Sequence, residues 1–402
     1  MNSFATTDVD PMALDAQHVL QTYARVPLVF ESGQGCALYT RDGRRYLDLI
    51  SGIGVAALGH AHPRLASALA AQAATLVHTS NLFHHPLQGE LASRLSALSG
   101  LPRAFFCNSG TEAVEACLKF ARRYWKAQGE PGRTTFVALE HSFHGRSMGA
   151  LSVTWDDHYR APFAPLLQDV VFVAANDPAA IRAAVTASTA AVIVEPIQGE
   201  GGVRPLSAAA ASAIAAACRQ SGALLIADEV QCGLGRTGQP FYSSALALRP
   251  DLMAIGKALG AGVPIAAALL SERVAAAAKP GDHGSTYGGN PLACRAALVF
   301  LEELVDGGLM SRAADAGVHL ERGLRAIAAR QSAVTDVRGS GLMWGLELDR
   351  PAAPVVQAAL ERGVLVNRTA ERVIRLLPPF IISREEIDEG LQAIEASIGA
   401  LA

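Results

Sequence analysis

Short runs of mainly apolar residues alternate along this chain with longer segments in which apolar positions recur near the helical period. The apolar runs cover residues 135–139, 170–173, 191–194, 222–227 and 252–255. A short continuous apolar run is typical of a strand that is buried on both faces, as in a parallel sheet. The segments between them, such as 64–76, 87–98 and 113–125, have the spacing of amphipathic helices. This alternation predicts an α/β fold with a mostly parallel sheet.

The pattern differs at the two ends of the chain. A short helical pattern covers residues 12–24, and two apolar runs then flank Asp42-Gly43, the strongest short signal for a β-hairpin. From about residue 306 the order changes to helix, strand and helix. Residues 337–347 alternate like an exposed sheet, residues 373–380 form an apolar strand with one arginine, and residues 384–401 form a closing helix.

The length of 402 residues exceeds the size at which a single hydrophobic core stops growing. We therefore predict one large domain and a smaller one. Residues 56–305 are expected to form the large domain, and residues 306–402 the small α+β domain. Residues 1–55 are expected to be an N-terminal segment that joins the small domain.

Composition narrows the class of protein. Half of the residues are hydrophobic and 18% are charged, as in ordinary globular chains. The net charge of −3 and the lack of a basic stripe argue against nucleic-acid binding. The alanine-rich stretches are broken before the ~20 apolar residues of a membrane span, and the polar first residues do not resemble a secretory signal. Six cysteines without CxxC spacing predict reduced thiols and a cytoplasmic enzyme.

One lysine stands in an unusual setting. The chain contains only four lysines, and Lys257 alone lies among apolar and small residues, with no acidic residue within five positions on either side. A buried ammonium group is costly, so such a lysine usually has a lowered pKa and a nucleophilic amine. This setting fits a Schiff-base lysine, but a snorkelling lysine at a strand end fits equally well.

Asp228 favours the first interpretation. It ends the apolar run 222–227, and ligands of parallel sheets collect at the carboxyl ends of the strands. Lys257 follows the next apolar run, at 252–255. Chemistry with pyridoxal phosphate (PLP) needs this pair, because the lysine holds the aldehyde and the carboxylate keeps the pyridine nitrogen protonated.

Other motifs follow strands or begin helices. Ser109 and Glu112 have the spacing of a capping box, and the helix start could hold a phosphate or be an ordinary capped end. Phe143 and Arg146 follow the run 135–139, where an aromatic ring can cover a cofactor and an arginine can bind a carboxylate. Glu195 and Glu200 suggest acid–base work, but a glycosidase would need more aromatic platforms than the 6% of aromatic residues provides.

Three short clusters carry less information. The turn cluster 284–291 could be a plain loop or a second phosphate contact. The histidine pairs at 60 and 62 and at 84 and 85 predict turns and not a metal site, because no further ligand has zinc-like spacing.

Six motifs in one order resemble a known family. They are Asn108-Ser-Gly-Thr-Glu112, His141-Ser-Phe-His-Gly-Arg146, Glu195-Pro-Ile-Gln-Gly-Glu200, Asp228-Glu-Val-Gln231, Gly256-Lys257 and Gly284-Ser-Thr-Tyr-Gly-Gly-Asn-Pro291. Together they closely resemble class III (ornithine-type) PLP-dependent aminotransferases of fold type I. The resemblance runs from about residue 20 to the C-terminus and is greatest to the acetylornithine branch, through Ser51-Gly-Ile53, Gly59-His-Ala-His-Pro63 and Ser80-Asn-Leu-Phe83.

The resemblance implies pyridoxal 5'-phosphate as the cofactor and assigns its contacts. Lys257 would bind the aldehyde and transfer the proton, Asp228 would pair with the ring nitrogen, and Gln231 would bond the ring hydroxyl. Phe143 would stack on the ring. The phosphate would be held by Ser109, Gly110, Thr111 and, from the neighbouring subunit of a homodimer with shared active sites, Thr286.

The substrate contacts follow in the same way. Arg146 would bind the α-carboxylate of the amine donor, and Ser285 of the neighbouring subunit would lie near the entrance. Glu200 and Arg375 resemble the pair that opens when glutamate or 2-oxoglutarate binds. Enzymes for free ornithine carry a tyrosine at the position of Ile53, so the resemblance favours an acylated α-nitrogen.

Three hypotheses result. The first is transfer of the terminal amine of N2-acetyl-ornithine or N-succinyl-ornithine to 2-oxoglutarate, giving the semialdehyde and glutamate in arginine metabolism. The second is an ω-aminotransferase for 4-aminobutyrate, ornithine or diamines, or a related aminomutase. The third is a silent PLP-binding regulatory protein, which would not need both Lys257 and Asp228. The acyl group and the direction of the pathway stay open.

Overall fold

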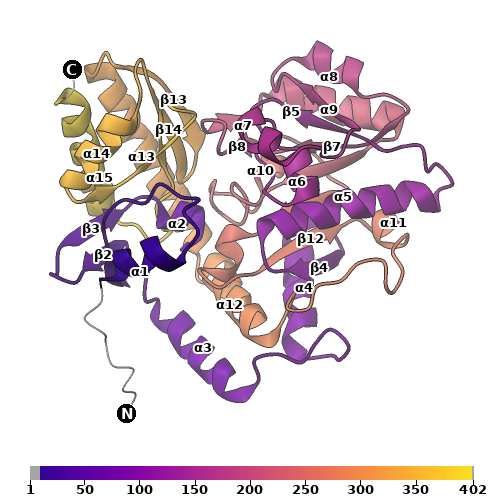
Figure 1. The fold of residues 1–402 in the computed structure, drawn as a ribbon, viewed down its shortest axis with the longest axis horizontal. Coiled ribbons are helices and arrows are strands. Elements are labelled where there is room, and N and C mark those ends of the chain that lie inside the picture. Colours follow the sequence, from indigo (N-terminus) through magenta and orange to yellow (C-terminus); the bar gives the residue numbers. More distant parts are fainter. Residues whose placement is uncertain (1–9, 401–402) are drawn as a thin grey trace.

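A seven-stranded sheet forms the centre of the larger half of the molecule in the computed structural model, which describes residues 10–400 (Figure 1). Its strands are, in spatial order, β4 (Arg103–Cys107), β12 (Ala266–Leu270), β11 (Leu252–Ile255), β10 (Leu224–Asp228), β7 (Thr189–Val194), β5 (Thr135–Leu139) and β6 (Val170–Val173). All are parallel except β12, which is antiparallel to both of its neighbours. The predicted α/β class with a mostly parallel sheet is confirmed.

Helices cover both faces of this sheet, which explains the continuous apolar runs. Helix α5 (Gly110–Ala127) packs on one face, against residues such as Ile193 and Ile226. Helices α8 (Pro178–Ala184) and α9 (Ala208–Ser221) pack on the other face, against the alternate residues of the same strands (Figure 1). Because both sides of each strand are buried, apolar residues occupy every position and not every second one.

Further helices surround the large domain: α3 (Pro63–Thr75), α4 (Pro86–Ser99), α6 (Met148–Ser152), α7 (Asp157–Arg160), α10 (Tyr242–Ala245), α11 (Glu272–Ala275) and α12 (Pro291–Leu301). The predicted helices 64–76 and 87–98 are thus present as α3 and α4. The predicted helix 12–24 is shorter, because α1 (Pro11–His18) ends at His18. No helix within residues 10–400 is long and apolar enough to cross a membrane.

The smaller half contains a four-stranded antiparallel sheet in the order β13 (Val334–Ser340), β14 (Met343–Leu348), β17 (Val373–Leu376) and β16 (Asn367–Thr369). The same half contains three helices: α13 (Leu309–Arg330), α14 (Ala353–Glu361) and α15 (Arg384–Gly399). The alternating stretch 337–347 is therefore a hairpin, with its turn at Gly341 (φ 55°). The predicted end of the closing helix at residue 401 lies outside the described residues.

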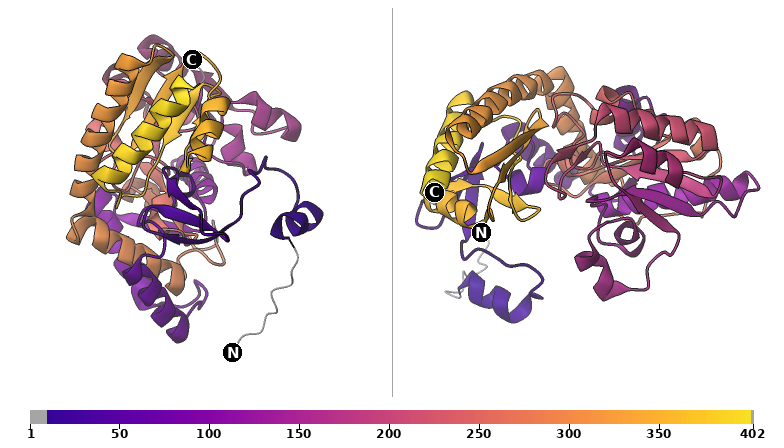
Figure 2. Two further views of the ribbon diagram at one scale, coloured as in Figure 1. Left: turned by 90° about the vertical axis from the view of Figure 1, so that its left-hand side faces the viewer. Right: turned by 90° about the horizontal axis from the view of Figure 1, so that it is seen from above.

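A second four-stranded sheet joins the two ends of the chain. The predicted hairpin is present as β2 (Ala37–Thr40) and β3 (Arg45–Asp48), with β1 (Phe30–Gln34) outside β2. Strand β15 (Val364–Leu365) pairs in parallel with β3. This pairing supports the predicted division into segments 1–55, 56–305 and 306–402, which stays a prediction. Helix α1 lies apart from the body of the molecule in both views of Figure 2 and buries no residue.

A left-handed turn follows the N-terminal hairpin. The four residues of α2 (Ser51–Gly54) all have positive φ, and Ile53 has φ 65° and ψ 49°. This conformation costs an L-residue roughly 1–2 kcal/mol, and the branched side chain of isoleucine makes it rarer still. The turn lies close to residues 257–260, which include the lysine singled out above. The structure thus places a strained residue next to the candidate site.

Candidate active site

Five strand ends meet at one pocket. Gly110 follows β4, Phe143 follows β5, Glu195 follows β7, Asp228 ends β10 and Lys257 follows β11. These residues line a cavity of about 250 Å³, together with Thr111, His144, Gly145, Arg146, Val230 and Gln231. The carboxyl edge of a parallel sheet is where such ligand pockets form. Eight of the residues singled out from the sequence line this one cavity.

Lys257 reaches the pocket from a short 3-10 turn that begins directly after β11, and its φ of 39° is another left-handed backbone value. Burial lowers the pKa of its ammonium group, and the carboxylates of Glu200 and Asp228 offset only part of this effect. A lowered pKa leaves more of the amine uncharged and nucleophilic at neutral pH. The surroundings of Lys257 therefore suit covalent chemistry better than a snorkelling role.

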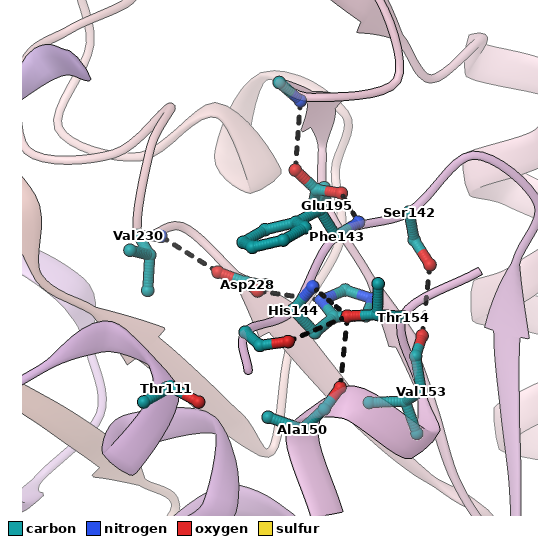
Figure 3. A network of polar contacts seen from close by, with 12 residues as sticks. Thr111, Ser142, Phe143, His144, Ala150, Val153, Thr154, Glu195, Asp228 and Val230 are labelled. Atoms are coloured by element: carbon teal, nitrogen blue, oxygen red, sulfur yellow. Dashed lines mark hydrogen bonds and ion pairs between the residues drawn. The ribbon is translucent and has the colours of Figure 1, made fainter. Parts of the chain in front are cut away.

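Asp228 is held by two hydrogen bonds. One oxygen accepts from the backbone N–H of Val230 at 3.1 Å, and the other lies 2.8 Å from Nδ1 of His144 (Figure 3). The His144 side chain is 0% exposed, and its Nε2 has no hydrogen-bond partner among residues 10–400. A proton on Nδ1, donated to Asp228, leaves only a lone pair unsatisfied on the buried ring. With the proton on Nδ1, the His144 ring holds the Asp228 carboxylate in place at the pocket.

The start of α5 forms another wall of the pocket. The capping box predicted from Ser109 and Glu112 is present. The first backbone N–H groups of a helix lack internal partners and attract anions. Thr111 is already engaged, because its hydroxyl accepts from the backbone N–H groups of Arg146 and Ser147 at 3.2 and 3.1 Å. This helix end can hold a phosphate chiefly through its backbone.

Arg146 lies at the exposed side of the pocket. Its guanidinium carbon is 3.8 Å from the ring centre of Tyr159 and 5.6 Å from that of Phe143. Stacking on Tyr159 holds the planar fork in place while its N–H groups stay available for a carboxylate. No sequence motif pointed to Tyr159, which lies in the short helix α7.

Glu200 and Arg375 are in contact across the two halves of the molecule. Arg375, from β17, is 1% exposed and donates to Glu200 at 2.5 Å. Its guanidinium group also donates to Gln231 at 3.2 Å and to Asn367 at 3.3 Å. Burial alone would raise the pKa of Glu200, but the charge of Arg375 holds it below its usual value. The carboxylate is therefore ionised and paired when the pocket holds no substrate.

Ser285 and Thr286 do not line this pocket within the single chain. Ser285 accepts from the side chain of Asn108 at 3.2 Å and from the backbone of Gly288 at 3.1 Å, and it lines a separate cavity. Thr286 is exposed. Their expected role at a neighbouring subunit's site therefore stays a prediction.

Known proteins resemble this chain over nearly its whole length. The Aminotransferase class-III family matches residues 19–398. An acetylornithine aminotransferase of Archaeoglobus fulgidus is 44% identical over 384 residues, covering 96% of this chain and 99% of that protein. Another, of Gloeobacter violaceus, is 45% identical over 387 residues, covering 96% of each chain.

Solved structures agree with the sequence relatives. The ornithine aminotransferase of Toxoplasma gondii superposes with a TM-score of 0.93 at 34% identity, covering 97% of this chain and 94% of that one. The acetylornithine aminotransferase of Elizabethkingia anophelis gives a TM-score of 0.86 at 30% identity, covering 97% of this chain and 98% of that one. The resemblance seen in the six motifs is thereby confirmed: with five strand ends around one lysine and one aspartate, this chain belongs to the class III aminotransferases.

Proposed function

We propose that this protein is a PLP-dependent aminotransferase that moves the terminal amine of N2-acetyl-ornithine to 2-oxoglutarate. The products would be the semialdehyde and glutamate. The observation that carries the proposal is the position of Lys257 and Asp228 in one pocket, with the Glu200–Arg375 pair beside it. The names of the relatives support the same donor.

The residues of the pocket fit PLP. Lys257 offers an amine with a lowered pKa to the aldehyde, and Asp228 offers a held carboxylate to the ring nitrogen. Phe143 offers a ring face, and the start of α5 offers backbone N–H groups to the phosphate. When bound, PLP supplies an electron-accepting ring that stabilises negative charge at the substrate carbon.

The protein's own groups would do the rest. Lys257 would take the proton from the substrate carbon and deliver it to the carbon of the PLP aldehyde group, because its amine is the basic group in the pocket. Arg146 would bind the distant carboxylate of either substrate. Arg375 would bind the near carboxylate of glutamate only, and Glu200 would neutralise Arg375 while acetylornithine reacts. One pocket could thus accept both a terminal and an α-amine.

The donor is selected at Ile53 in this proposal. An apolar side chain cannot compensate a charged α-ammonium, whereas an acylated nitrogen is neutral. We expect N-acetylornithine to exceed free ornithine and 4-aminobutyrate in kcat/KM. A donor panel with 2-oxoglutarate, followed by glutamate formation, checks this. Free ornithine as the best donor would instead favour the second hypothesis.

Single-turnover measurements of the two half-reactions test the pair Glu200–Arg375. Arg375→Ala should slow the glutamate half-reaction about tenfold more than the acetylornithine half-reaction, which corresponds to ~1.4 kcal/mol. The matched variant Glu200→Gln should act oppositely and raise reactivity toward α-amines. Equal losses in both half-reactions of Arg375→Ala would contradict this assignment.

We further propose a homodimer with shared active sites. Three large apolar residues are unusually exposed to water: Leu82 is 85%, Phe83 68% and Tyr287 64% exposed. The side chain of Asn81 donates to the carbonyl oxygens of Ser285 and Gly288 at 3.0 Å, so these apolar residues belong to two joined loops. A partner that covers these loops would bring Ser285 and Thr286 to its own pocket.

Mixed subunits test the shared site. Lys257→Ala and Thr286→Asp should each be inactive alone, because one lacks the amine and the other repels the phosphate. After unfolding and refolding together, part of the activity should return, since one site of each hybrid dimer carries neither change. Activity is compared with each variant refolded alone. A fully active monomer in sedimentation would rule out the shared site.

The cellular setting is also proposed. All six cysteines are free and buried. Free thiols support the predicted reducing, cytoplasmic environment. Burial raises the pKa of several of them, for example of Cys107 to about 12, so they are poor nucleophiles and play no part in the proposed reaction.

A further inference from the structure

Glu195 is a buried carboxylate that the proposed reaction does not use. It lies directly after β7 and is 5% exposed. Within residues 10–400 it forms no ion pair with lysine or arginine. Its two oxygens accept instead from two backbone N–H groups, that of Phe143 at 2.8 Å and that of Gly199 at 3.0 Å (Figure 3). Burying a carboxylate without a cation costs free energy, so the position of Glu195 needs an explanation.

The two N–H groups belong to different loops. Phe143 lies in the loop after β5. Gly199 lies in the segment after β7, directly behind the two-residue strand β8 (Ile197–Gln198). The same loops are joined by Gln198, whose side chain donates to the carbonyl oxygen of Glu140 at 2.7 Å. They also touch directly, because a Cβ atom on Gly201 would lie 2.3 Å from the carbonyl oxygen of His141. The two loops therefore form one tied unit.

Each loop carries residues of the candidate site. The loop after β5 presents Phe143 and Arg146 to the pocket, and the loop after β7 carries Glu200. The distance between the Phe143 ring and the Glu200 carboxylate thus depends on the contacts that hold the two loops together. We propose that Glu195 is a positioning residue that sets this distance and so keeps Glu200 paired with Arg375. This inference rests on the proposed function.

The chemistry of the carboxylate explains why glutamate suits this position. An ionised carboxylate has only acceptors, so it can bond both backbone N–H groups at once. A glutamine of the same shape has one acceptor and would face the second N–H with its own N–H₂ group. The substitution Glu195→Gln therefore removes one of the two hydrogen bonds with little change in side-chain volume.

The pKa of Glu195 makes its two hydrogen bonds sensitive to pH. Burial raises the pKa of Glu195 to about 7, with His144 acting to lower it and Asp228 to raise it. The other titratable groups that sense it are Lys257 and Cys232. About half of the Glu195 carboxyl groups are therefore ionised near pH 7. The carboxylate form becomes more populated as the pH rises, and a proton taken up as the pH falls would occupy one acceptor.

The test uses the full-length, PLP-loaded enzyme and single-turnover rates of both half-reactions. In Glu195→Gln, the ratio of the acetylornithine rate to the glutamate rate should fall about tenfold, because Arg375 is left free more often. The wild-type ratio should also fall as the pH drops below 7, whereas that of Glu195→Gln should stay flat. A purely structural role would lower thermal stability and leave the ratio unchanged.

Two further variants make the test specific. Asp177 also accepts from two backbone N–H groups, at 2.9 and 3.0 Å, but on one oxygen, Oδ1, at the start of α8 on the outside of the large domain. Asp177→Asn therefore controls for the loss of a carboxylate charge alone and should leave the ratio unchanged. Gln198→Met removes the hydrogen bond from Gln198 to Glu140 without changing the charge, and it should also lower the ratio. This variant keeps the test available if Glu195→Gln does not fold.

The outcomes separate this inference from the proposed function. A wild-type enzyme that performs neither half-reaction refutes the proposed function. A wild-type enzyme that performs both, with unchanged ratios in Glu195→Gln and Gln198→Met, overturns the positioning role alone. A ratio that falls equally in Asp177→Asn also overturns it, because the change would then not depend on the contacts of Glu195.

Discussion

Lys257→Ala is expected to bind PLP without a covalent link and to lose turnover by several orders of magnitude. The amine of Lys257 lies in the pocket with a lowered pKa, whereas the side chains of Lys119 and Lys126 belong to exposed positions of α5. Loss of both the covalent attachment and the base removes several kcal/mol of barrier lowering, where each ~1.4 kcal/mol is a factor of ten.

Borohydride reduction of the PLP-loaded enzyme, followed by peptide mapping, measures the attachment. The label should appear on Lys257 in the wild type and on no lysine in Lys257→Ala. Lys126→Ala serves as the control and should keep both the label and the rate. A label on Lys119, Lys126 or Lys279 would refute the assignment.

Asp228→Asn should lower kcat/KM by several orders of magnitude while changing the shape of the side chain very little. The neutral amide cannot hold a proton on the ring nitrogen, so the ring would accept electrons poorly. The amide would also disturb the contact with His144, since Nδ1 and the new N–H₂ group could face each other as two donors. Steady-state rates with N-acetylornithine and 2-oxoglutarate measure the effect.

Asp251 offers a matched control for this substitution. It lies at the opposite edge of the same sheet, where it accepts from the backbone of Leu225 at 3.0 Å and pairs with Arg273. Asp251→Asn should cost stability and leave kcat/KM close to that of the wild type. A near-normal rate for Asp228→Asn would show that Asp228 is merely structural.

The sequence predicted the central sheet because burial on both faces leaves an unbroken apolar run. The runs that became β5, β7, β10 and β11 were recognisable for this reason. Strand β12 was missed, since Ala266 to Leu270 is rich in alanine, which favours helices. Its place between β4 and β11 comes from tertiary packing, which local patterns do not contain.

The candidate site was predictable only where chemistry singles out a residue. Lys257 and Asp228 stood out as charged groups at the ends of apolar runs. His144 and Tyr159 did not, because their roles depend on contacts with residues far away in the sequence, namely Asp228 and Arg146. Glu195 drew attention only as a carboxylate suited to acid–base work, and no local pattern indicated that its two oxygens accept from the backbone N–H groups of Phe143 and Gly199.

The left-handed turn Ser51–Gly54 bears on how the donor preference of this enzyme could change. Ile53 is 41% exposed and contributes nothing to the core, so its replacement would leave no cavity. Its backbone already has the conformation that β-branched residues tolerate worst, so most other side chains would be no less stable there. If Ile53 selects the donor as we propose, position 53 is open to exchange during evolution or laboratory selection, with substrate fit as the main constraint and folding as a minor one.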